Sequence, residues 1–239
     1  MRGDQAPYSG VMYDLYIANK NYSSWSLRPW LLMRMLEIGF REQFRPFGHG
    51  APFTDFSPSG LVPCRVDGDQ AVWDTLAITE YLAERHAGVW SGASPARTWS
   101  RCASAEMHSG FSHLRNHYSM SCGVRIRANA PSAGLTRDLG RVDALWNQGL
   151  ARFGGPFLAG DRFTAVDAFY APVAFRFQSY GHALTGRAVD YLALLLDLAP
   201  MREWYEAALV EWWRDEQHEI EMNSAGVLLQ DFRTSQLPR

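Results

Sequence analysis

The first forty residues change from an alternating pattern to a continuous apolar one. Residues 13–18 alternate and are rich in aromatic and β-branched side chains, which predicts a strand. The run at 30–38 is largely apolar and stops at Gly39, as expected of a buried helix that ends at a glycine. The sequence therefore opens with a strand followed by a helix.

Two-residue periodicity then returns three times before position 74. It predicts strands at 40–47, at 64–66 and at 71–73, with a hairpin turn at 67–70 between the last two. A helix with a regular apolar face follows at 74–87. This order corresponds to a strand–helix–strand unit followed by a hairpin and a helix.

Strand patterns are not found after position 88, where apolar residues recur at steps of three and four. The residues from Asn223 onward lack a clear period and predict a polar tail. The chain should thus divide into an α/β domain at 1–88 and an all-helical domain with that tail at 94–239. The segments with helical spacing are 107–118, 139–150, 164–177, 191–196 and 200–221.

Composition excludes several classes of protein. Lys and Arg total 23 against 25 Asp and Glu, so no basic excess points to nucleic acid. The three cysteines form no CxxC pair, which argues against a disulfide framework and a structural zinc site. No apolar run approaches membrane-spanning length, and the first ten residues hold no leader-like apolar stretch. We expect a cytoplasmic protein that needs no metal, nucleic acid or membrane.

A group of hydroxyls stands where the first strand gives way to the first helix. Pro29 is tolerated only near a helix start, which places that start near Trp25 or Ser26. Ser23 and Ser24 then lie at or just before the N-cap, beside free backbone N–H groups and the positive end of the helix dipole. This corner is suited to an anion.

Four short sequences together resemble the soluble glutathione transferases. This family has a thioredoxin-like N-terminal domain and a helical C-terminal domain, and the resemblance extends from about Met12 to about Trp213. The closest motif resembles the zeta class, the maleylacetoacetate isomerase branch, in a serine-type bacterial form with Trp25 in place of its cysteine. The four sequences are SSWSLR at 23–28, SPSGLVP at 57–63, DT at 74–75 and TAVD at 164–167.

The resemblance implies that glutathione is the co-substrate. Its thiol has a pKa near the cysteine reference of about 8.5, and lowering that pKa by about two units requires about 2.7 kcal/mol. A hydroxyl bonded to an anion supplies about 1.5–3 kcal/mol and a helix N-terminus about 0.3–1 kcal/mol. We assign Ser23 as the donor and Ser24 as a close second. Considered alone, both serines also fit an ordinary helix cap, and Tyr22 is a rival donor because some transferase classes use a tyrosine there.

The rest of glutathione is placed by the same resemblance. The backbone of Val62 should pair with the cysteinyl unit, next to a cis peptide bond at Pro63. Asp74 should face the γ-glutamyl ammonium, while the Thr75 hydroxyl and the helix N-terminus face its carboxylate. Asp74 and Thr75 also fit an ordinary N-cap, and the two roles are compatible.

The electrophile should bind between the domains. Arg176 is a candidate for binding a substrate carboxylate, as are Arg125 and Arg127, because zeta-class enzymes use an arginine from the corresponding region. Side chains at 107–118 have the spacing of one helical face, a pattern that is more often core than binding site. The candidates there are Met107, Phe111, Arg115 and Tyr118.

Three functions remain open from the sequence. The first is a glutathione transferase that adds the thiolate to a small electrophile or uses it for cis–trans isomerisation. The second is a transferase-like binding protein without catalysis, favoured by Trp25 and by Thr75 in place of serine. The third is a thiol reductase of the same fold, which would need a cysteine at the corner. The family resemblance also implies a homodimer.

Overall fold

The computed structural model describes residues 12–48, 50 and 52–234. Its first domain contains one four-stranded sheet in the order β2-β1-β3-β4. Strand β1 pairs in parallel with β2 and antiparallel with β3, and β3 forms an antiparallel hairpin with β4. The predicted strand–helix–strand unit and hairpin are therefore confirmed. The strands are β1 (Tyr13–Ile17), β2 (Phe40–Phe44), β3 (Cys64–Asp67) and β4 (Gln70–Trp73).

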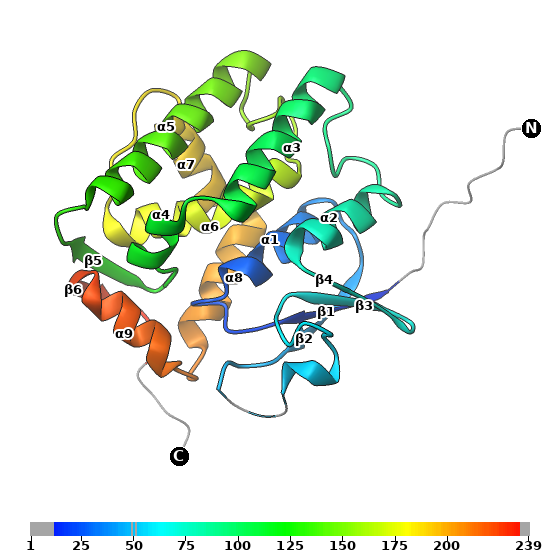
Figure 1. The fold of residues 1–239 in the computed structure, drawn as a ribbon, viewed down its shortest axis with the longest axis horizontal. Coiled ribbons are helices and arrows are strands. Elements are labelled where there is room, and N and C mark those ends of the chain that lie inside the picture. The colour runs from blue at the N-terminus through cyan, green and yellow to red at the C-terminus, as the bar shows by residue number, and fades with distance from the viewer. Residues whose placement is uncertain (1–11, 49, 51, 235–239) are drawn as a thin grey trace, which may run out of the picture.

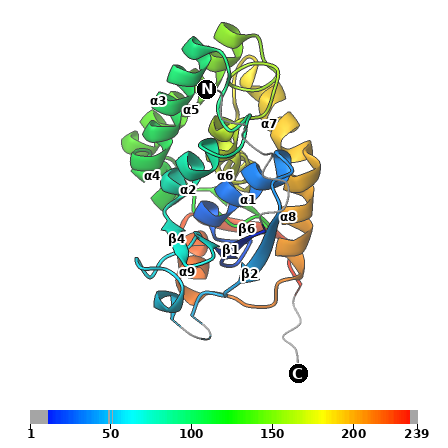
Figure 2. The ribbon, with the colours of Figure 1, turned by 90° about the vertical axis from the view of Figure 1, so that its right-hand side faces the viewer.

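Two helices and a short 3-10 turn complete this domain. Helix α1 (Ser24–Met35) follows β1, the turn covers Phe53–Asp55, and α2 (Thr75–Ala83) follows β4. Helix α1 begins one or two residues earlier than predicted, so that Ser23 is the N-cap. The two helices lie between the sheet and the second domain (Figure 2).

The second domain is helical apart from one pair of strands (Figure 1). Its first helix begins at Ser94, on the predicted side of the boundary. Its helices are α3 (Ser94–Ser109), α4 (Ser112–His117), α5 (Ala133–Phe153), α6 (Ala165–Tyr180), α7 (Ala188–Asp197), α8 (Ala199–Val210) and α9 (Glu216–Ser224).

Two helices predicted as continuous are interrupted. The 107–118 segment breaks at Gly110 and Phe111, where Phe111 has a φ of 56° and precedes α4. A Cβ at Gly110 would lie 2.7 Å from the carbonyl oxygen of Glu106, so this close approach requires glycine. The 200–221 segment also divides into α8 and α9. Regular apolar spacing was preserved across both breaks, which is why the pattern did not reveal them.

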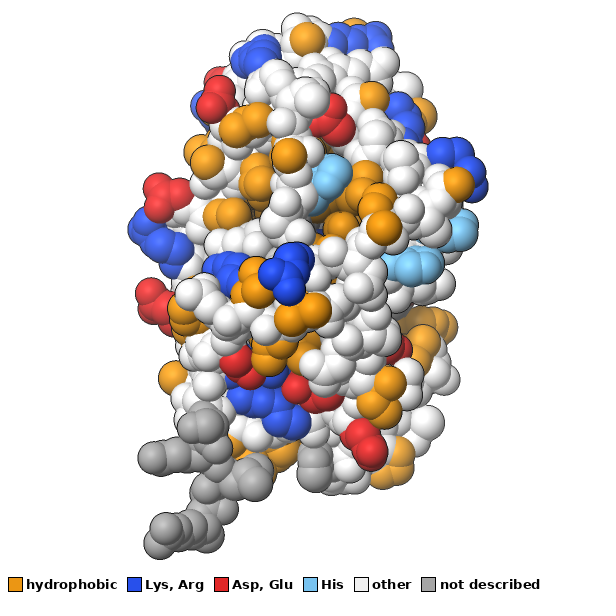
Figure 3. All heavy atoms as spheres, turned by 90° about the vertical axis from the view of Figure 1, so that its left-hand side faces the viewer, with side chains coloured by type: hydrophobic (Ala, Val, Ile, Leu, Met, Phe, Trp, Pro, Cys, Tyr) orange, Lys and Arg blue, Asp and Glu red, His pale blue; other side chains and the backbone are white. Residues whose placement is uncertain are grey.

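The prediction of helices alone after position 88 was wrong at one place. Strand β5 (Val124–Ala128) pairs antiparallel with β6 (Gly226–Asp231), so the segment predicted as a polar tail from Asn223 onward contains a strand. Figure 3 views the side of the molecule that carries these elements and shows hydrophobic side chains among charged ones. Strand β6 is largely exposed and shows no alternation, whereas β5 alternates apolar and charged residues over only five positions, a signal that the sequence analysis did not recognise.

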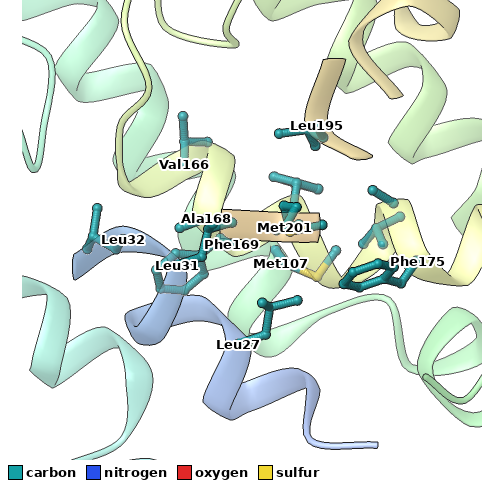
Figure 4. Close-up of a cluster of buried hydrophobic side chains, with 14 of the residues drawn as sticks. Leu27, Leu31, Leu32, Met107, Val166, Ala168, Phe169, Phe175, Leu195 and Met201 are labelled. Carbon is teal, nitrogen blue, oxygen red and sulfur yellow. The ribbon is translucent and has the colours of Figure 1, made fainter. Parts of the chain in front are cut away.

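The main core lies where α1 packs against α6, a largely apolar contact that joins the two domains. Leu27 and Leu31 of α1 face Phe169 of α6, and Met107 of α3 reaches into the same cluster (Figure 4). Helix α6 is buried along almost its whole length. It begins with the predicted capping box between Thr164 and Asp167, which is confirmed.

Within the described part of the chain, every helix is too short or too polar to cross a membrane.

Candidate functional site

A cavity of about 860 Å³ lies between the two domains. Its floor is the β1–α1 corner, and the loop before β3 and the start of α2 form one wall. The opposite wall comes from the helical domain. The first domain contributes Tyr22, Ser23, Ser24, Trp25, Phe47, Phe53, Ser59, Gly60, Leu61, Val62, Pro63, Trp73, Asp74 and Thr75, and the second contributes Arg115, Asn116, Ser119, Met120, Arg176, His218 and Glu221.

Ser23 occupies the N-cap of α1 but does not cap it. Its side chain accepts no bond from a backbone N–H of the first turn; instead its Oγ donates to the Oγ of Ser26 at 2.7 Å. Ser24, the first helical residue, has a side chain that bonds to no other described residue. Both serines line the cavity and are at least nine-tenths buried. The sequence left capping open as an alternative, and in this geometry the Ser23 hydroxyl does not cap α1.

The loop before Ser23 is held by the helical domain. The carboxylate of Glu211, just after α8, accepts the backbone N–H of Lys20 at 2.8 Å and that of Asn21 at 3.5 Å. The indole N–H of Trp204 donates to the carbonyl oxygen of Lys20 at 2.8 Å. Burial raises the pKa of Glu211 to about 7, and the Lys20 N–H and ammonium partly oppose this shift. The β1–α1 corner is thus positioned by residues almost 200 positions away in sequence.

The loop before β3 and the start of α2 form the adjoining wall. The Val62–Pro63 bond is cis, as the resemblance implied. Asp74 has a φ of 71° and caps α2 by accepting the N–H of Leu76 at 2.8 Å. The hydroxyl of Thr75 donates to the carbonyl oxygen of Trp25 at 3.5 Å.

Proline chemistry explains the contact between Thr75 and Trp25. Pro29 has no N–H, so the carbonyl of Trp25, four residues earlier in α1, lacks its helical partner. The Thr75 hydroxyl fills this position and ties α2 to the start of α1. In addition, His108 of α3 reaches the carboxylate of Asp74, with Nε2 at 3.6 Å from Oδ2.

Three arginines from different helices lie near one another, and two of them contact Trp25. The guanidinium of Arg28 lies 4.1 Å from the Trp25 ring centre and that of Arg115 lies 5.6 Å from it. Arg176 donates to the carbonyl oxygens of Tyr118 and Arg115. None of the three forms an ion pair with a carboxylate among the described residues.

Two of these arginines, Arg115 and Arg176, line the cavity. Burial and the two neighbouring guanidiniums lower the pKa of Arg28 to about 9. Burial lowers the pKa of Arg176 to about 10, with Tyr180 opposing the shift.

The hydroxyl of Tyr22 is already bonded to a side chain of the helical domain. Its hydroxyl donates to Glu219 of α9 at 2.6 Å, and Arg233 also pairs with Glu219. Burial, with the Glu219 carboxylate second, raises the pKa of Tyr22 well above its ordinary range. In this arrangement the phenol bonds to a carboxylate of the same chain, so Tyr22 is a weaker candidate than the serines for donation to a thiolate.

The structure brings together eight of the eleven residues predicted for the site. Met107, Phe111 and Tyr118 do not line this cavity: Met107 lies in the core, Phe111 lies 6.5 Å from Tyr170 between ring centres, and Tyr118 stacks on Tyr180 at 4.3 Å. Their role in substrate binding stays a prediction. The eight are Ser23, Ser24, Val62, Pro63, Asp74, Thr75, Arg115 and Arg176.

Sequence reasoning missed the wall made by the segment after α4 and by α9. Asn116, Ser119 and Met120 reach the cavity because the chain turns at the break before α4, and His218 and Glu221 do so because α9 folds back. No local pattern marks these residues, since their position depends on the two helix breaks.

Comparison with known proteins identifies the family. Residues 22–85 match the sequence model described as glutathione S-transferase, N-terminal domain, and residues 130–207 match the one described as glutathione S-transferase, C-terminal domain. Together the two matches cover more than half of the chain. The chain belongs to the glutathione transferase superfamily.

Individual relatives agree with this family. Glutathione S-transferase F13 of Arabidopsis thaliana is 23% identical over 167 residues, covering 64% of this chain and 70% of the relative. Glutathione S-transferase 3 of Zea mays is 30% identical over 131 residues, covering 50% of this chain and 56% of the relative. A glutathione transferase homolog from Burkholderia gl BGR1, solved with bound glutathione, superposes with a TM-score of 0.63 at 15% identity, covering 82% of this chain and 97% of that one.

Proposed function

We propose that this protein binds glutathione in the cavity between its domains and stabilises the thiolate with the hydroxyl of Ser23. The thiolate then adds to a small electrophile, or adds to it transiently and isomerises it. The observation that carries the proposal is an N-cap serine that lines the cavity and whose hydroxyl is not used for capping. A serine needed only for the helix would bond to a first-turn N–H.

The energetics of the corner suffice for this role. A hydroxyl that donates to an anion contributes about 1.5–3 kcal/mol and the helix N-terminus about 0.3–1 kcal/mol, together enough to lower a thiol pKa by about two units. The thiol proton leaves to solvent, so the proposed chemistry needs no separate base.

The remaining parts of glutathione have partners along the same wall. The backbone at Val62 lies at an exposed turn and can pair with the cysteinyl unit as a strand partner. The N-terminus of α2 offers N–H groups to the γ-glutamyl carboxylate, and the Thr75 hydroxyl joins them by giving up its bond to the Trp25 carbonyl. Asp74 offers its carboxylate to the ammonium. His108 approaches Asp74 from the helical domain, so the ammonium would displace or share this contact.

For the electrophile we propose a compound that carries an anionic group. Arg115 and Arg176 line the part of the cavity opposite the serines and lack carboxylate partners among the described residues. A carboxylate on the substrate would complete the cluster with charge-assisted hydrogen bonds. The zeta-like resemblance stays a prediction, as does the choice between addition and isomerisation.

The test is a pH titration of glutathione bound to the wild type and to Ser23→Ala, following thiolate absorbance in the ultraviolet. We expect the variant to bind glutathione with little loss of affinity, while the pKa of the bound thiol rises by about two units, as the energies above require. Ser24→Ala is the matched control, since it removes a neighbouring cavity hydroxyl. An unchanged thiol pKa in Ser23→Ala would exclude Ser23 as the donor.

A further inference from the structure

The hydroxyl of Ser26 lies directly behind that of Ser23. Their Oγ atoms are 2.7 Å apart, and Ser26 is completely buried. The Oγ of Ser26 also accepts the backbone N–H of Ala18, at the end of the first strand, at 3.3 Å. Ser26 does not line the cavity and would not touch glutathione.

Counting protons shows that this pair is incompletely bonded. A hydroxyl has one proton to donate and two lone pairs to accept with. Ser26 accepts from Ala18 and from Ser23, which uses both lone pairs. Its own proton has no acceptor among the described residues, although a buried donor without an acceptor costs free energy.

We propose that Ser26 is a positioning residue that turns its proton towards Ser23 when the thiolate binds. Ser23 then points its own proton at the sulfur, and its lone pair accepts from Ser26. The chain of bonds runs from the Ala18 N–H to Ser26, from Ser26 to Ser23, and from Ser23 to the sulfur. Both hydroxyls only rotate, no proton changes its oxygen, and every donor gains an acceptor.

This arrangement distinguishes Ser23 from Ser24. A hydroxyl that accepts a hydrogen bond is polarised and becomes a stronger donor. Ser23 has such a partner, whereas the Ser24 side chain bonds to no other described residue. The inference rests on the proposed function and deepens it, because it explains which of the two cavity serines serves the thiolate.

The experiment is the thiolate titration, extended to Ser26→Ala and Ser26→Thr. We expect Ser26→Ala to raise the pKa of the bound thiol by about half a unit, a smaller shift than in Ser23→Ala, because only the polarisation of one bond is lost. Glutathione affinity should change less than about twofold. Ser26→Thr keeps the hydroxyl and should restore the wild-type value.

Ser100→Ala is the matched control. Ser100 is likewise completely buried in a helix, and its Oγ donates to the carbonyl oxygen of Ala96 at 2.8 Å, away from the cavity. This variant should leave the thiol pKa unchanged. If Ser26→Ala does not fold, Ser26→Cys replaces it, because a thiol is a weak donor of similar size and should raise the pKa in the same direction.

Each outcome is decisive. If the thiol pKa in Ser26→Ala equals that of the wild type, the role of Ser26 is overturned and the proposed function is not affected. The same holds for Ser26→Cys where it replaces the alanine variant. A Ser26→Thr variant with the same thiol pKa as Ser26→Ala also overturns the role of Ser26. A large loss of glutathione affinity in Ser26→Ala also overturns it, because it indicates a general structural role. A wild-type protein that binds glutathione without any lowering of the thiol pKa overturns this inference together with the proposed function.

Discussion

Individual side chains at the corner behave differently from what their types suggest. Ser23 is a preferred capping residue, yet its hydroxyl bonds to Ser26. Trp25 stands where the zeta-like motif has cysteine, and its ring contacts Arg28 and the edge of His108, whose ring centre is 5.2 Å away. The sequence placed both residues at the start of a helix, because Pro29 limits where that helix can begin. It did not reveal their partners, which come from the tertiary fold.

At the residue scale the clearest consequence concerns Arg176. We expect Arg176→Met to raise KM for a carboxylate-bearing electrophile by about tenfold to a hundredfold, the cost of one lost hydrogen bond to a charged group. KM for a neutral electrophile should change little. Methionine preserves much of the buried volume, which favours folding. The measurement is steady-state kinetics with an aryl halide and its carboxylated analogue.

Arg125→Met is the control for this substitution. Arg125 also donates to backbone carbonyls, those of Cys122 and Val124, but it lies outside the cavity. It should leave both KM values unchanged. Equal effects of Arg176→Met on the two electrophiles would contradict recognition of a substrate anion.

At the scale of elements, α9 and β6 complete the cavity. The chain reverses direction after α9, which brings β6 beside β5. In this arrangement His218 and Glu221 of α9 line the cavity. One buried side chain connects these pieces: Arg233 pairs with Glu219 of α9 and with Asp231 at the end of β6. The C-terminal segment is therefore a structural part of the site.

Loss of this connection should loosen the segment locally. We expect Arg233→Met to accelerate amide hydrogen exchange over 216–231, corresponding to about 1–3 kcal/mol of local stability, since it leaves two carboxylates and the Tyr22 hydroxyl with fewer partners. Hydrogen exchange with mass spectrometry measures this effect. Exchange in α6 should not change.

Arg202→Met serves as the comparison. Arg202 pairs with Asp197 on the surface, where an ion pair contributes little to stability. Faster exchange throughout the chain in Arg233→Met, rather than in α9 and β6 alone, would show that Arg233 supports the whole fold.

At the scale of the whole molecule, the helical domain holds the loop that positions the thiolate donor. Glu211 makes the most direct of these contacts, and it does so as a buried acid that faces the Lys20 ammonium and the Cys122 thiol. Its pKa is raised from the ordinary 4.5 to about 7, so the folded protein holds this proton more tightly than the unfolded chain. The contribution of Glu211 to the free energy of unfolding is therefore fully present below about pH 4.5 and is lost as the pH rises through 7.

The sign of this effect gives a prediction for Glu211→Gln. Between pH 5 and pH 8 the wild type should lose about 2–3 kcal/mol of unfolding free energy that the neutral glutamine variant does not lose. Urea unfolding of both proteins at the two pH values measures this difference. Asp167, whose pKa burial raises to about 6, contributes equally to both proteins and cancels.

Glu206→Gln provides the control, because Glu206 is exposed on α8, the helix that ends just before Glu211. It should follow the wild type at both pH values. A variant Glu211→Gln that loses as much stability as the wild type over this interval would show that Glu211 does not titrate in the folded protein.

The sequence by itself determined the two-domain order, the start of α1 and the local motifs that lie on the cavity wall. These features depend on nearby residues: a proline that limits a helix start, a capping box and alternating strands. They placed Ser23 at the start of a helix, whereas the resemblance to the glutathione transferases implied that Val62 and Asp74 belong to the same site.

Only the tertiary structure decided which of the remaining residues reach that site. Met107 has the spacing of a cavity residue but lies in the core, whereas Met120 and Glu221 line the cavity because the chain breaks before α4 and α9. Side-chain periodicity shows which face of a helix is apolar, but it does not show which other element packs against that face. The bond between Ser23 and Ser26, and the support of Glu211 for the same corner, likewise arise only when the strand, helix and second domain are packed together.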